Sequence, residues 1–181
     1  MEAILSTYGK KLGEFTMTCP FCGGELVVTE TQYDVPGVGL VLIVNRQCKK
    51  CGYKKNEVVP LKSKGHKRVY FHVEKPEDYR VKVIRSPFAK IMIPELGLEM
   101  RPGIDAEMFI TNVEGIIYIF KDILERMNVL EPSEESKKMS IILSEILEKQ
   151  NASFTLIIDD REGLSSIEAR EKGKLLIEII S

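Results

Sequence analysis

CPFCGG at residues 19–24 and CKKCG at residues 48–52 each place two cysteines three positions apart and follow them with glycine. This is the pattern of a zinc knuckle, in which the chain turns tightly so that two thiolates reach one ion. Glycine after the second cysteine allows the positive φ that such a turn needs. Because these stretches hold all four cysteines of the chain, the sequence predicts a single compact site.

Four cysteines, Cys19, Cys22, Cys48 and Cys51, are therefore the predicted ligands of one Zn²⁺ ion. Four thiolates complete a tetrahedral shell and leave no position open for water, so we expect a structural zinc and not a catalytic one. A redox CxxC motif is the alternative, and the absence of a following βαβ pattern disfavours it. Disulfides rarely persist in a reducing compartment, which also favours metal binding.

The segment between the two cysteine pairs predicts a zinc ribbon. VVTETQYDVPG and VGLVLIVNRQ are typical of two strands joined by a turn at Pro36-Gly37, and a hairpin brings the two pairs together at an entropic cost that grows slowly with its length. We therefore expect the ribbon to cover residues 18–61, after an N-terminal extension over residues 1–17.

A basic run overlaps the second cysteine pair. Basic side chains outnumber acidic ones strongly between Arg46 and Arg68, where Glu57 is the single acidic residue. Most such runs are a solvated face, but this one is also a candidate surface for a partner. The candidate partner-binding residues are Arg46, Lys49, Lys50, Tyr53, Lys54 and Lys55.

Composition narrows the class of protein. The chain has 181 residues and a formal net charge of -1, which argues against a surface built entirely for nucleic acid. No apolar run approaches the roughly 20 residues of a membrane-spanning helix, and the start MEAILSTYGKKLGEF lacks the apolar stretch of a signal peptide. We expect a cytoplasmic protein that binds no membrane.

Residues 62–181 predict a mainly β domain with a helical insertion. Short apolar runs such as YRVKVIRS and AKIMIP alternate in the way of half-buried strands. At Thr111 the period changes to the α-helical value; Thr111 and Glu114 suggest a capping box, and a second helix follows Pro132-Ser133. The predicted helical hairpin covers about 111–150, and strands return with SFTLIIDD, so we expect strands from both sides of the insertion to pair.

Taken together, these segments resemble the ZPR-type zinc-finger family. The resemblance spans Cys19 to about Ser166 and rests on CPFCGG, CKKCGYKKNEV, IRSPFAKIMIPELGLEM, ITNVEGIIYIFKDIL and FTLIIDDREG in this order. It implies a zinc ribbon followed by a double-stranded β-helix, that is, a jelly-roll-like domain, with the helical hairpin inserted in it. It also implies binding to a translation elongation factor 1α-type GTPase. The chain carries the module once, like an archaeal form, whereas eukaryotic members carry it twice.

Three classes of function compete. The resemblance implies a binding or chaperone-like factor, and the alternative is a nucleic-acid-binding ribbon with Tyr53 and Tyr70 as stacking surfaces. An enzyme is not expected, because His66 and His72 are the only histidines and no two-histidine, one-carboxylate motif occurs. Asp159-Asp160 is better interpreted as a turn at a strand end than as an acid/base pair. No nucleotide-binding glycine motif is present.

Overall fold

The computed structural model describes residues 9–35, 39–169 and 171–180. The chain divides into two compact units, residues 1–64 and residues 65–181. We call them the ribbon unit and the β domain, and each is described by itself.

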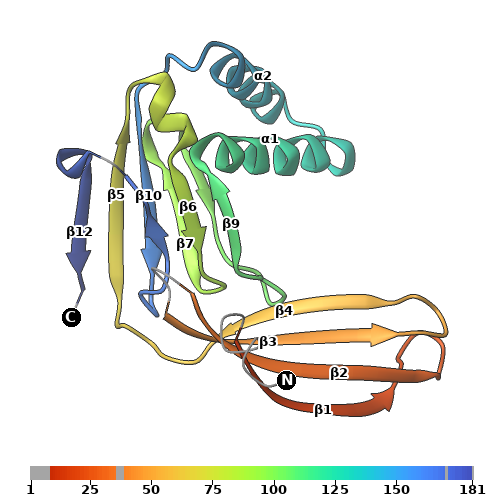
Figure 1. Cartoon of the computed structure of the whole chain (residues 1–181). Helices are drawn as coiled ribbons and strands as arrows, with labels where there is room; N and C mark the ends of the chain where they lie inside the picture. The colour runs from red at the N-terminus through yellow and green to blue at the C-terminus, as the bar shows by residue number, and fades with distance from the viewer. Residues whose placement is uncertain (1–8, 36–38, 170, 181) are drawn as a thin grey trace. The chain divides into compact units, whose positions relative to one another are not determined.

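The ribbon unit is a four-stranded antiparallel sheet with the order β1-β2-β3-β4 (Figure 1). β2 and β3 are the two predicted strands, which pair in continuous register from Leu26 with Cys48 to Val35 with Gly39. The predicted turn at Pro36-Gly37 lies outside the described residues. The strands are β1 (Lys10–Thr18), β2 (Glu25–Val35), β3 (Gly39–Cys48) and β4 (Lys54–Pro60).

β1 differs from the expectation of an extension over residues 1–17, because it supplies an edge strand of the ribbon sheet. Its side chains are mostly exposed, so the segment has no buried side to mark it as a strand. Phe15 pairs with Val28 and Met17 with Leu26. Those partners are buried, and β1 lies beside them as the outer strand.

The β domain consists of a five-stranded sheet, order β12-β5-β10-β7-β8, and a three-stranded sheet, order β11-β6-β9. Strands from before and after the helical insertion pair as expected, since β10 lies between β5 and β7. The strands are β5 (Lys67–Val73), β6 (Lys82–Arg85), β7 (Ala89–Ile93), β8 (Leu98–Met100), β9 (Phe109–Asn112), β10 (Phe154–Asp160), β11 (Ser166–Ile167) and β12 (Leu175–Ile179). Three short 3₁₀ turns are η2 (Pro76–Arg80), η3 (Pro94–Leu96) and η4 (Lys172–Lys174).

One continuous apolar core holds this domain together. Strict alternation along β10 buries every second residue from Phe154 to Asp160, and β7 alternates in the same way. Side chains of both sheets meet those of the first helix and two residues of the second in this core. The prediction of a mainly β, jelly-roll domain with a helical insertion is confirmed.

The insertion is a helical hairpin of α1 (Val113–Leu130) and α2 (Glu134–Lys149), as Figure 1 shows. The predicted capping box on Thr111 is wrong. Asn112 is the N-cap, and its side-chain oxygen accepts the backbone N–H of Gly115 at 2.7 Å. Thr111 still belongs to β9, where it pairs with Val83, so the sheet holds the backbone of Thr111 in an extended conformation.

Gly115 lies where the end of β9 approaches the first turn of α1. A Cβ atom at this position would lie 2.0 Å from Oγ1 of Thr111. We therefore expect Gly115→Ala to destabilise the β domain by about 1–3 kcal/mol, in spite of the higher helix propensity of alanine. Urea unfolding measures the loss.

The double variant Thr111→Ala/Gly115→Ala is the matched control, because it removes the Thr111 hydroxyl, the atom nearest to the new methyl group. It should recover most of the stability lost in the single variant. A single variant as stable as the parent chain would contradict this account of Gly115.

Candidate metal centre

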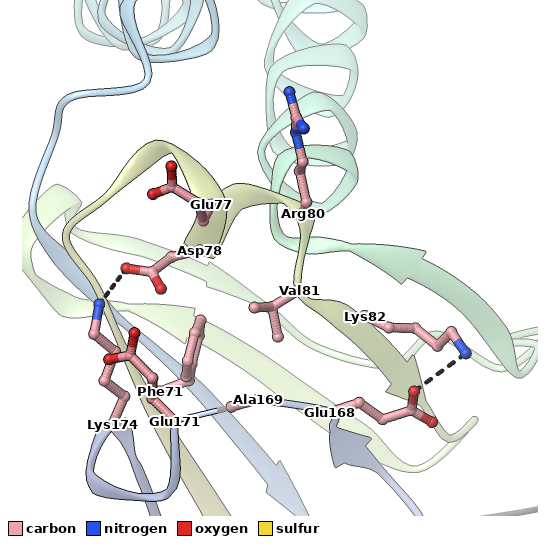
Figure 2. A pocket seen from close by; sticks show the side chains of 10 residues that line it. All are labelled: Phe71, Glu77, Asp78, Arg80, Val81, Lys82, Glu168, Ala169, Glu171 and Lys174. Atoms are coloured by element: carbon pink, nitrogen blue, oxygen red, sulfur yellow. Dashed lines mark hydrogen bonds and ion pairs between the residues drawn. The ribbon is translucent and has the colours of Figure 1, made fainter.

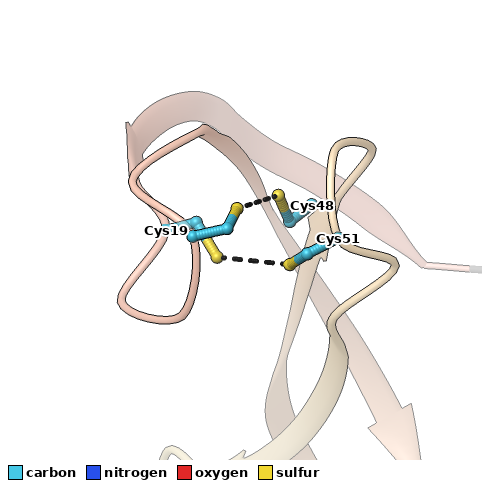
Figure 3. A group of neighbouring side chains, drawn as sticks. Cys19, Cys48 and Cys51 are labelled. Carbon is cyan, nitrogen blue, oxygen red and sulfur yellow. Dashed lines mark hydrogen bonds between the residues drawn. The ribbon is translucent and has the colours of Figure 1, made fainter.

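Four sulfur atoms gather at one end of the ribbon sheet (Figure 3). The Sγ atoms of Cys19, Cys22, Cys48 and Cys51 all lie within 4.8 Å of one another. Cys19 and Cys51 are 3.7 Å apart and Cys22 and Cys48 are 3.6 Å apart, measured between Sγ atoms. These separations exclude a disulfide, whose sulfurs lie about 2.05 Å apart.

The two cysteine turns have the same backbone hydrogen bonds. In the first, Gly23 N–H donates to the carbonyl of Cys19 at 2.9 Å; in the second, Gly52 N–H donates to the carbonyl of Cys48 at 3.0 Å. Gly23 and Gly52 both have positive φ, 65° and 77°. The glycine prediction is therefore confirmed at both turns, and a side chain there would strain the backbone.

The donor set fits zinc. In a tetrahedral site with zinc–sulfur bonds of about 2.3 Å, sulfurs are separated by about 3.8 Å, close to the distances found here. The sulfurs come from two turns that β2 and β3 bring together, because Leu26 pairs with Cys48. Four sulfur ligands close the shell, which is the coordination of a structural zinc.

The two cysteines of the second turn have opposite pKa shifts. The N–H of Cys51, and more weakly that of Lys50, lowers the pKa of Cys48 to about 7, although burial acts in the opposite direction. The N–H of Tyr53 lowers the pKa of Cys51, but burial and the side chains of the other three cysteines outweigh it and raise this pKa to about 12. The turn therefore favours the thiolate of Cys48 over that of Cys51.

Comparisons with known proteins agree with this geometry. Residues 12–63 match the model of the ZPR1 zinc-finger domain, and residues 77–176 match the model of the ZPR1 jelly-roll domain. The chain belongs to the ZPR1 family. The two ZPR1 domains fall within the ribbon unit and the β domain.

Relatives occur among archaeal and eukaryotic ZPR1 proteins. An uncharacterised ZPR1-like protein of Methanocaldococcus jannaschii is 37% identical over 156 residues, which cover 83% of this chain and 79% of that protein. A ZPR1-like protein of Pyrococcus horikoshii is 29% identical over 71% of this chain and 59% of its own length. A zinc finger chaperone of Schizosaccharomyces pombe is 29% identical over 81% of this chain, but this covers only 34% of that protein.

The basic candidates do not form one free positive surface. Arg46 Nη1 lies 2.6 Å from a carboxylate oxygen of Glu57, and Lys55 Nζ lies 2.9 Å from the other. Arg46 and then Lys55 lower the pKa of Glu57, so this acidic residue offsets part of their charge. Lys49 and Lys50 are exposed in the second cysteine turn, and Lys54 is exposed at the start of β4.

Tyr53 supports the metal site. It packs against the small core formed by Cys19, Leu26 and Cys48. Its ring also contacts that of Phe21, with centroids 4.6 Å apart. Tyr53 is therefore only partly available as a stacking surface.

Sequence reasoning missed the exposed apolar side chains. Phe21 lies between the two cysteines of the first turn and is 70% exposed. Phe15 and Met17 are exposed on β1, and Phe15 lies in one cross-strand row with Val28 and Arg46. Their apolar type is visible in the sequence, but no local pattern of residues shows that these side chains stay exposed.

The acidic pair forms the expected turn at the end of β10. Asp160 is buried and accepts the backbone N–H groups of Glu162 and Leu164 at 3.0 and 2.9 Å. Asp159 lies on the other face, where it contacts Nε2 of His66 at 2.6 Å and Arg68 at 2.9 Å. The two carboxylates therefore do not act on one group.

A hollow of about 510 Å³ lies beside η2 in the β domain, and Figure 2 shows the side chains that line it. Two ion pairs belong to its lining: Lys174 binds Asp78 at 2.5 Å and Lys82 binds Glu168 at 3.1 Å. Burial raises the pKa of Asp78, but Lys174 and two backbone N–H groups outweigh burial and hold the pKa below its ordinary value. The Asp78–Lys174 pair therefore joins η2 to η4.

Two further findings concern the described part of the chain as a whole. Within it, the four cysteines are the only group of three or more histidine, cysteine or acidic side chains that could hold a metal ion. None of its helices is both long enough and apolar enough to cross a membrane.

Proposed function

We propose that the chain is a zinc-dependent protein-interaction factor of chaperone type that binds an elongation factor 1α-type GTPase in the cytoplasm. Membership of the ZPR1 family supports a chaperone-like role, because a relative is named a zinc finger chaperone. The GTPase is the partner that the sequence resemblance implies. In this proposal the zinc has no catalytic part and maintains the fold of a binding surface.

Exposed apolar side chains are the observation that carries the proposal. Phe21 on the ribbon unit is 70% exposed, and Val129 and Leu130 at the end of α1 are 82% and 87% exposed. Large apolar side chains grouped on a surface are typical of sites that bind other proteins, and aromatic anchors often dominate the binding energy. Each unit therefore offers an apolar contact to a partner.

The charge pattern favours a protein partner over nucleic acid. Glu57 engages two of the candidate basic residues, Arg46 and Lys55, and the chain as a whole has a net charge of -1. We also propose that the chain is not an enzyme. His66 and His72 each contact a different carboxylate, Asp159 and Glu74, so they do not converge on one reaction centre.

Direct binding tests the proposal. We expect immobilised chain to retain a purified elongation factor 1α-type GTPase in at least one of its GTP-bound, GDP-bound and nucleotide-free states. Phe21→Ala should weaken this binding about tenfold or more, because the ring is an exposed aromatic anchor. Isothermal titration calorimetry measures both affinities.

Ile104→Ala is the matched control, since Ile104 is even more exposed than Phe21 but lies in the β domain outside the surfaces named above. It should bind as the parent chain does. If the chain retains the GTPase in none of the three nucleotide states, the proposed partner is refuted. Binding to single-stranded RNA that weakens steeply with salt would support the nucleic-acid alternative instead.

A further inference from the structure

β12 is the outermost strand of the five-stranded sheet. It pairs with β5 on one side, from Leu175 opposite Phe71 to Ile179 opposite Lys67, and within the described residues no strand pairs with its other side (Figure 1). An open edge presents backbone N–H and C=O groups to any chain that can pair with it. The question is which chain fits.

The outward-facing peptide groups can be assigned from the ladder. Ile180 N–H donates to the carbonyl of His66 at 2.9 Å, in register with the β12–β5 pairs. In an antiparallel ladder, every second residue directs its N–H and C=O to the same neighbour. The backbone N–H and C=O groups of the even-numbered residues therefore point toward β5. Those of Leu175, Ile177 and Ile179 point away from β5, toward the open edge of the sheet.

The same three residues form an apolar row in which Leu175 is partly buried against the core and the next two are exposed. Leu175 and Ile177 lie opposite Phe71 and Val69, which are buried in the core, and directly paired residues share a face of the sheet. Ile177 is nevertheless 52% exposed and Ile179 is 71% exposed. The row thus continues the core face of the sheet beyond the part that the domain covers.

No charged side chain of β12 itself lies in this row, although Lys67 of β5 lies opposite Ile179. Edge strands of natural proteins commonly carry an inward-pointing charge, a lysine or a proline that blocks pairing. The only charged residue of β12 is Glu178, whose carboxylate accepts the hydroxyl of Tyr70 at 2.8 Å and lies 3.7 Å from Arg68. Glu178 is therefore held on the other face, against β5.

We propose that β12 pairs with β12 of a second copy of this chain, antiparallel and about a twofold axis at Ile177. In this register Ile177 lies opposite its counterpart, and Leu175 lies opposite Ile179 of the second copy. All three outward-facing residues then exchange backbone hydrogen bonds, and their side chains form one apolar row across both copies. The strand is complementary to itself in hydrogen bonding and in side-chain pattern.

The size of this contact sets the expected strength. A pairing of two five-residue strands buries less surface than the standard interface of about 1,600 Å². We therefore expect a reversible dimer with a dissociation constant on the order of micromolar, as for other weak interfaces. This inference does not depend on the proposed GTPase partner.

Sedimentation velocity over a concentration series tests the proposal with the full, zinc-loaded chain. We expect the parent chain to pass from monomer to dimer. Ile177→Pro should abolish the dimer because it removes an outward N–H while leaving the bonds to β5 intact, as prolines in edge strands do. Ile177→Lys should abolish it as well, since two like charges would meet on the axis.

Ile110→Lys is the matched control, because Ile110 is equally exposed on β9, in the other sheet. It should dimerise as the parent chain does. Hydrogen exchange provides an independent readout: protection of the amides of Leu175, Ile177 and Ile179 should increase with concentration. A monomer at every concentration, or a dimer that persists in both Ile177 variants, would overturn the proposal.

Discussion

Removal of zinc is expected to unfold the ribbon unit and to leave the β domain folded. The small core at the metal end consists of Cys19, Leu26 and Cys48, with Cys22 and Tyr53 packed on it, so three of its five members are ligands. Structural zinc contributes about 10–16 kcal/mol of apparent binding free energy in small zinc domains, which is more than the whole stability of most domains of this size. The β domain has a separate core.

Circular dichroism during titration with a chelator measures this effect, and elemental analysis should give one zinc per chain. Cys48→Ser should behave like the chelated protein, because it removes one of four ligands. Lys49→Ser, in the same turn, supplies no ligand in either form and should keep its zinc and its structure. Protein that is purified without chelator and contains no zinc would contradict the metal site.

Asp160→Ala is expected to destabilise the β domain by about 3–5 kcal/mol, the cost of breaking a buried network around a charge. Besides the N–H groups of Glu162 and Leu164, the Asp160 carboxylate accepts the N–H and the hydroxyl of Ser165, both at 2.6 Å. Burial lowers the pKa of Arg85, and the charge of Asp160 acts against this. Without Asp160, the buried N–H groups of Leu164 and Ser165 and the hydroxyl of Ser165 would lose their acceptor.

Urea unfolding measures the loss, and Asp159→Ala is the control. Asp159 contacts His66 and Arg68 near the surface, so its removal should cost about 1 kcal/mol. Equal effects of the two substitutions would contradict the central role of Asp160.

The stability of the β domain is also expected to depend on pH, because of Asp160. Burial raises the pKa of Asp160, but the bonds from Ser165 and its neighbours outweigh burial and leave the pKa below its ordinary value. A depressed carboxyl pKa contributes stability that is present above the ordinary value, about 4, and is lost as the pH falls through the folded-state pKa. When the pH is lowered, the free energy of unfolding should fall less for Asp160→Asn than for the parent chain. Urea unfolding at several pH values measures both.

The metal site could be predicted from sequence because its determinants are local. Each cysteine pair lies within one turn, and the glycines that follow supply the backbone conformation found at Gly23 and Gly52. A hairpin between the two cysteine pairs is enough to bring them together, and β2 and β3 form this hairpin. Four ligands and a structural zinc follow from these local features.

The elements of the β domain were also predictable, but their ends were not. Alternation predicts β6 and β7, and helical spacing predicts the hairpin. The N-cap moved from Thr111 to Asn112 because pairing with Val83 keeps Thr111 in β9. The sequence does not predict β1, because this edge strand lacks the buried alternation of an inner strand.

By itself, the sequence determined the zinc ligands, the succession of strands and helices, and the family, since each depends on residue types at short spacing. Tertiary structure alone decided that Glu57 engages Arg46 and Lys55, that Asp160 is buried in its turn, and that β12 ends a sheet with Ile177 and Ile179 exposed. These features depend on which distant strands pair and in what register. A register is set by the packing of the whole domain, so no local pattern of residues contains it.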